Sequence, residues 1–318
     1  MTRRGWSTQG IPDQSGRTVV ITGANGGLGK ETARAMAGRG ARVVMACRNQ
    51  DKGRAAVDDV RSTWPDSDLV LMKLDLANLT SVREFVDELT TAVDRVDLLI
   101  NNAGVMALPY KLTADGFEMQ LGTNHMGHFA LTGLLLPRLI EAGGARVVTV
   151  SSQAHRMGKM NWNDLSYERG YNDWTAYGQS KLANLLFAFE LDRLLRVAEL
   201  DVHSLAAHPG YSDTDLQHVG PRERNSALMN RLMGLGNKLL AQSAEMGALP
   251  TLRAAADPDA QGGEYYGPGG LGEVRGPPIK VKARAAARNS VDMKRLWQVS
   301  LEATGVSFDA LERASASS

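Results

Sequence analysis

The chain alternates short apolar runs with longer amphipathic segments, and this order constrains its fold more than any other feature. The short runs end at turns or charged residues, so they predict buried strands at 18–21, 42–46, 69–72, 97–100, 145–150 and 202–206. Segments of helical length lie between them, at 28–38, 50–62, 79–92, 115–141 and 173–196. This alternation predicts an α/β fold of the Rossmann type, a doubly wound parallel sheet with helices on both faces. Ligands of such sheets bind beyond the carboxyl ends of the strands.

The length of 318 residues and the hydrophobic fraction of 43% predict one large core and a single domain, 1–318. We expect an N-terminal segment at 1–16, a Rossmann core at 17–267 and an extension at 268–318. Glycines and prolines between 267 and 278 should interrupt regular structure. After them, Met293, Leu296, Trp297 and Leu301 recur at helical spacing. They predict a C-terminal helix that packs back on the body and precedes a frayed tail.

The charge and cysteine content exclude several classes of function. Lys and Arg number 36 against 35 Asp and Glu, so no general field attracts nucleic acid or an anionic membrane. The one cysteine, Cys47, allows no internal disulfide, and no Cys/His spacing resembles a zinc site. No apolar stretch reaches the roughly 18 residues of a membrane anchor. We therefore expect a soluble, cytoplasmic protein that binds no metal.

A glycine-rich turn joins the first strand to the first helix. Gly23, Gly27 and Gly29 stand there with Asn25 and Leu28. Such a turn lets a pyrophosphate approach backbone N–H groups and the positive end of the helix. The sequence predicts a dinucleotide site here; the alternative is a plain turn between strand and helix.

The end of the second strand bears on the choice of cofactor. A cofactor that lacks the 2′-phosphate is usually held there by an acid, but this chain reads Ala46-Cys-Arg-Asn49. Arg48, beside Asn49, offers a fork of donors that suits a phosphate monoester. We expect NADP(H) rather than NAD(H), unless Arg48 is merely a solvated residue at a strand end. Lys30 and Arg39 are weaker candidates for the same role.

Polar residues close the third and fourth strands as well. Asp75 and Leu76 follow the third strand at the depth where an adenine would lie. Asn78 or Thr80 can cap the next helix, which leaves Asp75 for the ligand. The fourth strand ends in Asn101-Asn-Ala-Gly104, so Asn102, Ala103 and Gly104 are further candidates for cofactor contact.

Tyr177 and Lys181 lie four residues apart, on one face of a predicted helix. The pKa of a phenol is about 10, and it must fall by roughly two to three units for proton exchange near neutral pH. A cation within about 4–6 Å can supply much of that change. The pair therefore predicts acid/base chemistry beside the nucleotide site.

These motifs together resemble the short-chain dehydrogenase/reductase family. Thr22-Gly-x-x-x-Gly-x-Gly29, Asn101-Asn-Ala-Gly104, a serine and Tyr177-x-x-x-Lys181 occur in the family's order, and the match runs from about residue 17 to 267. The narrower resemblance is to the retinol-dehydrogenase-like branch, which includes the WW-domain oxidoreductases. It is carried by Thr22–Asn25, Met45–Arg48, Thr123–Phe129, Ser151–His155 and His208–Gly210. That branch usually favours NADP(H), in agreement with Arg48.

The resemblance implies roles for single residues. Tyr177 would be the general acid/base, Lys181 would lower its pKa and hold the nicotinamide ribose, and Ser152 would hydrogen-bond the substrate oxygen. Asn124 matches the family's relay asparagine, which holds a water between Lys181 and solvent. The carboxamide would be bound by Pro209, Gly210, Ser212 and Thr214. The family commonly forms homodimers or homotetramers through the helices of Asn124 and Tyr177.

Two apolar segments point to the substrate. The stretch between Ser152 and Tyr177 is longer than the family's usual spacing and carries Met157, Met160, Trp162, Leu165, Tyr167, Tyr171 and Trp174. A second apolar flap has Leu228, Met229, Leu232, Met233 and Leu235. Methionines and aromatics there predict an adaptable lipophilic pocket, unless they only seal the loops onto the core. The resemblance implies retinoid, steroid or other long lipophilic alcohols, aldehydes or ketones.

Other interpretations remain for the histidines and for the whole site. His125 and His128 lie three apart on a helix, but no third metal ligand is evident. His155 and His208 are expected near the mouth of the site, where either could touch substrate. The alternative function is a nucleotide-sensing binding protein with a vestigial active site. Sugar-nucleotide epimerase or dehydratase chemistry is disfavoured by the spacing of the glycines.

Overall fold

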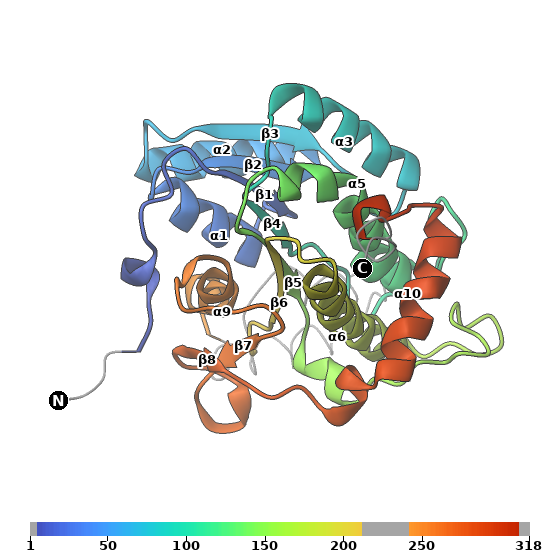
Figure 1. Ribbon diagram of the computed structural model, residues 1–318. Helices are drawn as coiled ribbons and strands as arrows, with labels where there is room; N and C mark the ends of the chain where they lie inside the picture. The colour runs from blue at the N-terminus through green and yellow to red at the C-terminus, as the bar shows by residue number, and fades with distance from the viewer. Residues whose placement is uncertain (1–4, 212–241, 312–318) are drawn as a thin grey trace.

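The computed structural model describes residues 5–211 and 242–311, which form an eight-stranded sheet between two layers of helices (Figure 1). The strands lie in the order β3-β2-β1-β4-β5-β6-β7-β8. Their bounds are β1 Thr18–Thr22, β2 Arg42–Cys47, β3 Leu69–Lys73, β4 Leu98–Asn101, β5 Ala145–Val150, β6 Val202–Ala207, β7 Tyr265–Pro268 and β8 Pro278–Lys280. The six predicted strands and the Rossmann-type parallel sheet are confirmed, since β1 to β7 run parallel.

The last two strands were not predicted. β7 and β8 are four and three residues long and pair antiparallel, with Pro268 opposite Pro278. Pro278 is tolerated because β8 is an edge strand, where a missing N–H interrupts no further ladder, and Pro268 ends β7 beyond the residues that pair with β6. The expectation that residues 267–278 interrupt regular structure is therefore wrong at both ends of that stretch. The C-terminal extension contributes a strand to the sheet as well as a helix.

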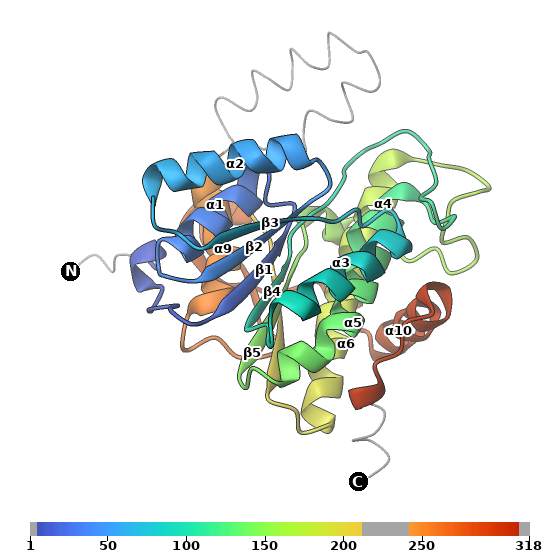
Figure 2. The same ribbon diagram turned by 90° about the horizontal axis from the view of Figure 1, so that it is seen from above.

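Helices cover both faces of the sheet (Figure 2). On one face lie α1 (Gly27–Ala37), α2 (Gln50–Thr63) and α9 (Ala244–Ala256); on the other lie α3 (Leu79–Ala92), α5 (Gly127–Ile140) and α6 (Asp173–Val197). Alternate strand residues supply two separate cores: Val19 and Ile21 pack in the first and Val20 in the second. The short 3₁₀ turns are η1 (Thr8–Gly10), η3 (Gln153–Arg156), η4 (Leu271–Glu273) and η5 (Ala285–Arg288).

The segment predicted as one helix at 115–141 is divided into three parts. It starts with the single turn α4 (Met119–Leu121), which Glu118 caps by accepting hydrogen bonds from two backbone N–H groups. A π-helical turn at Gly122–Met126, called the π-turn below, then leads into α5. Such turns often occur at functional sites, and this one contains Asn124.

The C-terminal helix α10 (Ser290–Thr304) packs against α6, as the spacing of its apolar residues predicted (Figure 1). The Trp297 ring stacks on Phe187 of α6, with centroids 6.0 Å apart. It also meets Phe129 of α5 edge-on, at 5.2 Å. Within residues 5–211 and 242–311, α10 and the other helices are all too short or too polar to cross a bilayer.

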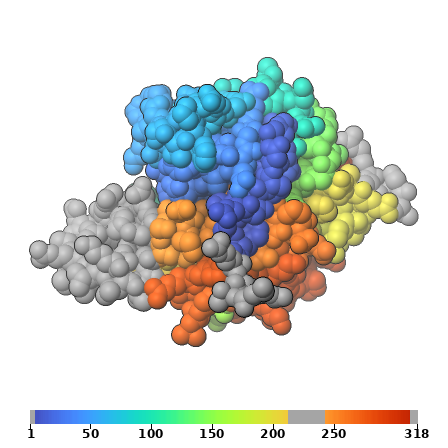
Figure 3. Space-filling model, turned by 90° about the vertical axis from the view of Figure 1, so that its left-hand side faces the viewer, coloured from blue at the N-terminus to red at the C-terminus, as the bar shows by residue number. Residues whose placement is uncertain are grey.

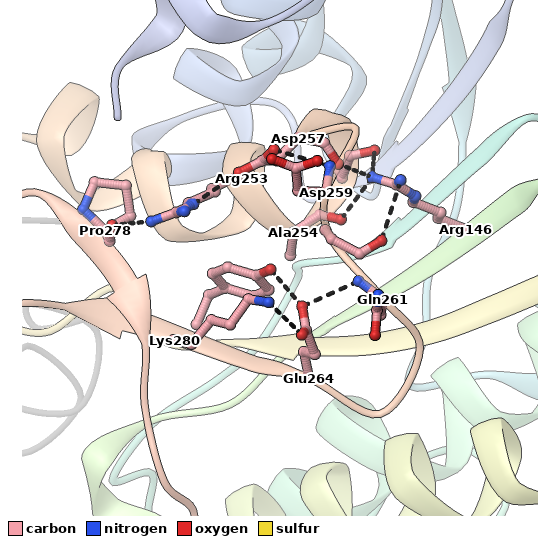
Figure 4. A network of polar contacts seen from close by, with 12 residues as sticks. Arg146, Arg253, Ala254, Asp257, Asp259, Gln261, Glu264, Pro278 and Lys280 are labelled. Carbon is pink, nitrogen blue, oxygen red and sulfur yellow. Dashed lines mark hydrogen bonds and ion pairs between the residues drawn. The ribbon is translucent and has the colours of Figure 1, made fainter. Parts of the chain in front are cut away.

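A polar network fixes the sheet at the edge opposite the carboxyl ends of the strands (Figure 4). Arg146 of β5 donates hydrogen bonds to the carbonyl oxygens of Asp257 (2.8 Å), Ala255 (3.2 Å), Ala260 (3.3 Å) and Ala254 (3.4 Å). These carbonyls belong to the last turn of α9 and the loop after it, whose oxygens have no partner within the helix. One guanidinium thus joins the sheet to the end of α9.

Candidate active site

The carboxyl ends of the parallel strands and the loops after them surround a cavity of about 700 Å³. Sixteen residues predicted for cofactor or catalysis line it: Gly23, Asn25, Gly27, Leu28, Gly29, Arg48, Asp75, Leu76, Asn102, Ala103, Gly104, Ser152, Tyr177, Lys181, Pro209 and Gly210. Asn49 and Asn124 are not part of the lining. Ser212, Thr214 and the flap at 228–235 lie outside the described residues. The structure therefore brings most of the predicted site together.

The glycine turn lies directly against the end of β4. Gly23 and Gly27 adopt left-handed backbone conformations, with φ of +67° and +48°. A Cβ atom on Gly29 would lie 2.4 Å from the Gly23 carbonyl oxygen and 2.6 Å from Asn102 Nδ2. A side chain cannot be accommodated at Gly29, so the turn packs closely against the end of β4. The glycines of the turn line the cavity, where their backbone can contact a phosphate group.

The N-terminus of α1 lacks the side-chain cap that most of the other long helices have; α5 also has none, but it continues directly from the π-turn. α2, α3, α6, α9 and α10 each begin with an Asn or Ser side chain that accepts a hydrogen bond from a first-turn N–H group. α1 begins at Gly26, which has no side chain to do so. Its first-turn N–H groups and the helix dipole therefore remain available to an anion in the cavity. This fits the pyrophosphate of a dinucleotide.

Two cations line the cavity where β2 ends. Arg48 follows β2, and Lys52 lies in the first turn of α2. Neither forms an ion pair with a carboxylate within the described parts of the chain. Lys52 was missed in the sequence, although its position four residues after Arg48, at the start of a predicted helix, was a usable signal.

The other residues proposed near this position have different contacts. Asn49 is not in the lining because its Oδ1 caps α2, accepting from Lys52 N at 2.9 Å. Lys30 forms an ion pair with Asp59 at 2.6 Å. Arg39 donates to the carbonyl oxygen of Thr8 at 2.9 Å. None of the three lines the cavity.

Asp75 lies in the lining as predicted. Asn78 caps α3 through the N–H groups of Thr80 and Ser81, so the cap expected from Asn78 is confirmed and Thr80 is not the cap. Asp75 is only partly free, because its Oδ1 accepts from Ala77 N at 3.0 Å.

Tyr177 and Lys181 lie on one face of α6, both almost completely buried from solvent. Lys181 Nζ is 5.8 Å from the centroid of the Tyr177 ring and donates to the carbonyl oxygen of Val150 at 3.2 Å. Ser152 follows β5, caps η3 and forms a hydrogen bond with Tyr177. The hydroxyl, the phenol and the amine thus meet at one wall of the cavity.

The expected lowering of the Tyr177 pKa is not found in this structure. Burial raises the pKa of Tyr177 to about 12, and the hydrogen bond with Ser152 acts in the opposite direction. Burial also lowers the pKa of Lys181 to about 8, so the amine is still mostly protonated at pH 7 but loses its charge at a much lower pH than an exposed lysine. The reason is that loss of water disfavours the charged form of both groups.

Asn124 acts on the loop after β4 rather than lining the cavity. Its side chain accepts from Val105 N at 2.7 Å and donates to Val105 O and to Ser180 Oγ, both at 2.9 Å. A Cβ atom on Gly104 would lie 3.1 Å from Asn124 Oδ1 and 3.3 Å from Lys181 Nζ. Asn124 therefore lies near Lys181 and holds the backbone at Val105, next to the glycine that both side chains approach.

His155 and His208 do not lie at the mouth of the cavity, contrary to expectation. Both are completely buried, and neither is in the lining. His155 Nδ1 is 2.6 Å from the Ser152 carbonyl oxygen. His208 Nδ1 accepts from Gly210 N at 3.2 Å, and its Nε2 lies 3.1 Å from Glu273 Oε2. They support the two loops that carry Ser152 and Gly210.

Some side chains of the long stretch between Ser152 and Tyr177 line the cavity, and others only pack the loop onto the core. Met157 and Trp174 line the cavity, beside Met106 and Tyr211, which the sequence analysis missed. Met160, Trp162 and Leu165 instead pack against the core around α6. Tyr171 is also structural, since its hydroxyl donates to Leu108 O at 2.8 Å. One end of the cavity is therefore mainly apolar.

Comparisons with known proteins agree with this geometry. The family described as short chain dehydrogenase matches residues 17–225. Human retinol dehydrogenase 12 is 42% identical over 294 residues, covering 92% of this chain and 88% of its own. Human retinol dehydrogenase 13 is 41% identical over 302 residues, covering 94% and 89%. A crystal structure of an uncharacterised protein from Mycobacterium paratuberculosis is 44% identical, with a TM-score of 0.79 and coverage of 96% and 99%.

The family uses nicotinamide cofactors, and the cavity brings the glycine turn together with Ser152, Tyr177 and Lys181. The chain therefore belongs to the short-chain dehydrogenase/reductase family, is similar to the retinol dehydrogenases, and is an oxidoreductase that acts on alcohol or carbonyl groups.

Proposed function

We propose that this protein is an NADP(H)-dependent oxidoreductase of lipophilic alcohols and the corresponding aldehydes or ketones. The observation that carries the proposal is the arrangement of one continuous cavity. Two cations lie where β2 ends, the catalytic side chains lie on one wall, and an apolar group of side chains lies beyond them. The retinol dehydrogenase names of the relatives support a lipophilic substrate.

The bound nicotinamide ring would supply or accept the hydride. The protein's own residues then handle the oxygen atom of the substrate. In reduction, the Ser152 hydroxyl donates a hydrogen bond to the carbonyl oxygen and polarises it, and Tyr177 delivers the proton that converts this oxygen to a hydroxyl. In oxidation, the deprotonated form of Tyr177 takes that proton from the alcohol. Because burial raises the pKa of Tyr177 to about 12, the phenol is protonated at neutral pH and ready for the reductive direction.

The preference for NADP(H) rests on Arg48 and Lys52. Both line the cavity, and no carboxylate follows β2 at the position where one would bind a ribose 2′-hydroxyl. A guanidinium and an ammonium suit a phosphate monoester through charge-assisted hydrogen bonds. Asp75, the carboxylate in the lining, lies after β3 rather than β2.

The substrate class rests on the apolar end of the cavity. Met106, Met157, Trp174 and Tyr211 lie there beside Tyr177. Trp174 meets the Tyr177 ring edge-on, with centroids 6.3 Å apart, so a substrate oxygen at Tyr177 places its carbon chain against an aromatic surface. Thioether and aromatic side chains adapt to long apolar chains of varied shape.

Replacement of Tyr177 by Phe tests the proposal. We expect loss of carbonyl-dependent NADPH oxidation, because the proton donor is gone, whereas NADPH still binds by calorimetry. Tyr110→Phe is the matched control, since that phenol is exposed and outside the cavity. A series of straight-chain aldehydes of increasing length reports on the pocket. Activity close to wild type in the Tyr177 variant would contradict the acid/base role of Tyr177. No gain in kcat/KM with chain length would contradict the lipophilic substrate class.

A further inference from the structure

The completely buried imidazole of His128 lies between segments of the site that are far apart in the sequence. Its Nε2 is 2.9 Å from the Thr22 hydroxyl oxygen, at the end of β1 where the glycine turn begins. Its Nδ1 is 3.0 Å from the carbonyl oxygen of Asn124, in the π-turn. One side chain thus spans the two motifs.

The partners determine which ring nitrogen carries the proton. A carbonyl oxygen can only accept, so Nδ1 must be the N–H group that donates to Asn124. Burial lowers the pKa of His128 to about 4, so the ring is neutral and Nε2 is an acceptor. The Thr22 hydroxyl therefore donates to Nε2; the other acceptor within its reach, Ile100 O, is farther away at 3.3 Å.

The same hydroxyl also holds the end of β4. Thr22 Oγ1 accepts hydrogen bonds from the N–H groups of Asn102 and Ala103, both at 2.9 Å. With its proton donated to His128, this oxygen has all of its hydrogen-bonding capacity in use. His128, Thr22 and the two N–H groups form a connected network, and Thr22, Asn102 and Ala103 all line the cavity.

His125, in the π-turn beside Asn124, provides a contrast to His128. It is equally buried, but its Nε2 lies 2.8 Å from Ser300 Oγ of α10, on the side away from the cavity. It also packs edge-on against Phe187. Among the described residues, its Nδ1 has no hydrogen-bond partner. A purely structural role suits His125, whereas both nitrogens of His128 are bonded to residues of the site.

We infer that His128 is a positioning residue that holds Thr22 and Asn124 together, so that the cofactor-binding turn and the π-turn near Lys181 keep one relative placement. The Thr22 bond supports cofactor binding. The Asn124 bond supports turnover, because the Asn124 side chain holds Val105 and lies near Lys181. Only the expected effect on turnover rests on the proposed function.

Two substitutions separate the two bonds. In His128→Asn the amide nitrogen takes the place of Nδ1 and can donate to Asn124, but nothing reaches Thr22. In His128→Gln the amide oxygen takes the place of Nε2 and can accept from Thr22, but the donor to Asn124 is lost. We expect about tenfold weaker NADPH binding with nearly normal kcat at saturation for Asn, and nearly normal binding with about tenfold lower kcat for Gln. His125→Gln is the control.

NADPH Kd is measured by calorimetry, kcat with an aldehyde at saturating NADPH, and the melting temperature in parallel. Loss of thermal stability in both His128 variants with unchanged Kd and kcat would show a merely structural role and overturn the inference. Changes in Kd or kcat in His125→Gln as large as those in the His128 variants would also overturn the inference. If wild-type protein binds NADPH but reduces no carbonyl, the proposed function fails. The NADPH Kd values of wild type and His128→Asn still test whether the hydrogen bond to Thr22 supports cofactor binding.

A measurement on the wild-type protein needs no folded variant. Nitrogen-15 spectra of histidine-labelled protein report the tautomer of each ring directly. We expect one ring, absent from the spectrum of His128→Asn, to remain the neutral Nδ1–H tautomer from pH 5 to 8. An Nε2–H tautomer, or titration of this ring near its ordinary pKa, would refute the inferred hydrogen bonds.

Discussion

Loss of both cations where β2 ends should strongly reduce the preference of the protein for NADPH over NADH. The perturbation is the double substitution Arg48→Ala and Lys52→Ala. Both side chains line the cavity without a carboxylate partner in the described chain, so no ion pair has to break before they bind phosphate. The predicted result is weaker binding of NADPH with little change for NADH, because the two cofactors differ only in the 2′-phosphate.

The magnitude follows from the strength and exposure of these contacts. A hydrogen bond to a charged group contributes about 1.5–3 kcal/mol when it is shielded from water. Both side chains are exposed, so about 1–1.5 kcal/mol each is the appropriate value, and solvent and salt reduce it further. The two together correspond to a Kd for NADPH about 30- to 150-fold higher.

The assay is a titration of each cofactor into the double variant, the single variants and wild type, at low and at high salt. Arg54→Ala is the control, since Arg54 lies on α2, is exposed and pairs with Asp51. Added salt should reduce the preference of wild type for NADPH and leave the double variant unaffected. An equal change in affinity for NADPH and NADH would refute the reasoning, because it would mean that these cations hold a part common to both cofactors.

Two further predictions concern stability. Burial depresses the pKa of Lys181 from 10.5 to about 8, so the unfolded chain binds more protons between these values, and the cofactor-free protein should gain about 2 kcal/mol of stability from pH 8 to pH 10. Lys181→Met, measured by urea unfolding at each pH, should lack this gain, and an unchanged pH dependence would contradict the shift. Arg146→Met removes one short and three longer hydrogen bonds to carbonyls at the end of α9 (Figure 4). Calorimetry should therefore show a free energy of unfolding about 3 kcal/mol lower, with unaltered NADPH affinity. A melting temperature within about 1 °C of wild type would show that water replaces the guanidinium.

The cavity is open to solvent near the mouth, where Tyr211 and the apolar side chains of the long stretch lie. Figure 3 shows the N-terminal part of the chain, in blue, above the part that contains α9 and β8, in orange. The exposed side chain of Met157 and the half-exposed ring of Trp174 border the cavity. A lipophilic substrate would cover both, which removes apolar surface from water and favours binding.

Much of the fold could be predicted because its signals are local. Buried parallel strands are continuous apolar runs, and a run such as Val43–Ala46 needs no knowledge of its neighbours to be recognised. The edge strand β8 has only one buried residue, Pro278, and carries Ile279 and Lys280 exposed. It is a strand because β7 lies beside it, and no pattern in its three residues indicates this.

The candidate site divides in the same way. The glycine turn and the Tyr177–Lys181 spacing were readable, because backbone conformation and helical periodicity are set within a few residues. The supporting roles of His155 and His208 were not. His155 bonds to nearby Ser152 but packs against the ring of Tyr265, which is distant in the sequence, and His208 contacts Glu273 of a distant turn.

By itself, the sequence determined the order of strands and helices, the glycine turn and the placement of Tyr177 and Lys181 on one face of a helix. Only the tertiary structure decided the protonation of that pair, the placement of Lys52 beside Arg48, and the contact of His128 with both Thr22 and Asn124. The physical reason is that propensity and periodicity act over neighbouring residues. Burial, and with it pKa and hydrogen-bond partners, depends on what the rest of the chain brings to the opposite side of each residue.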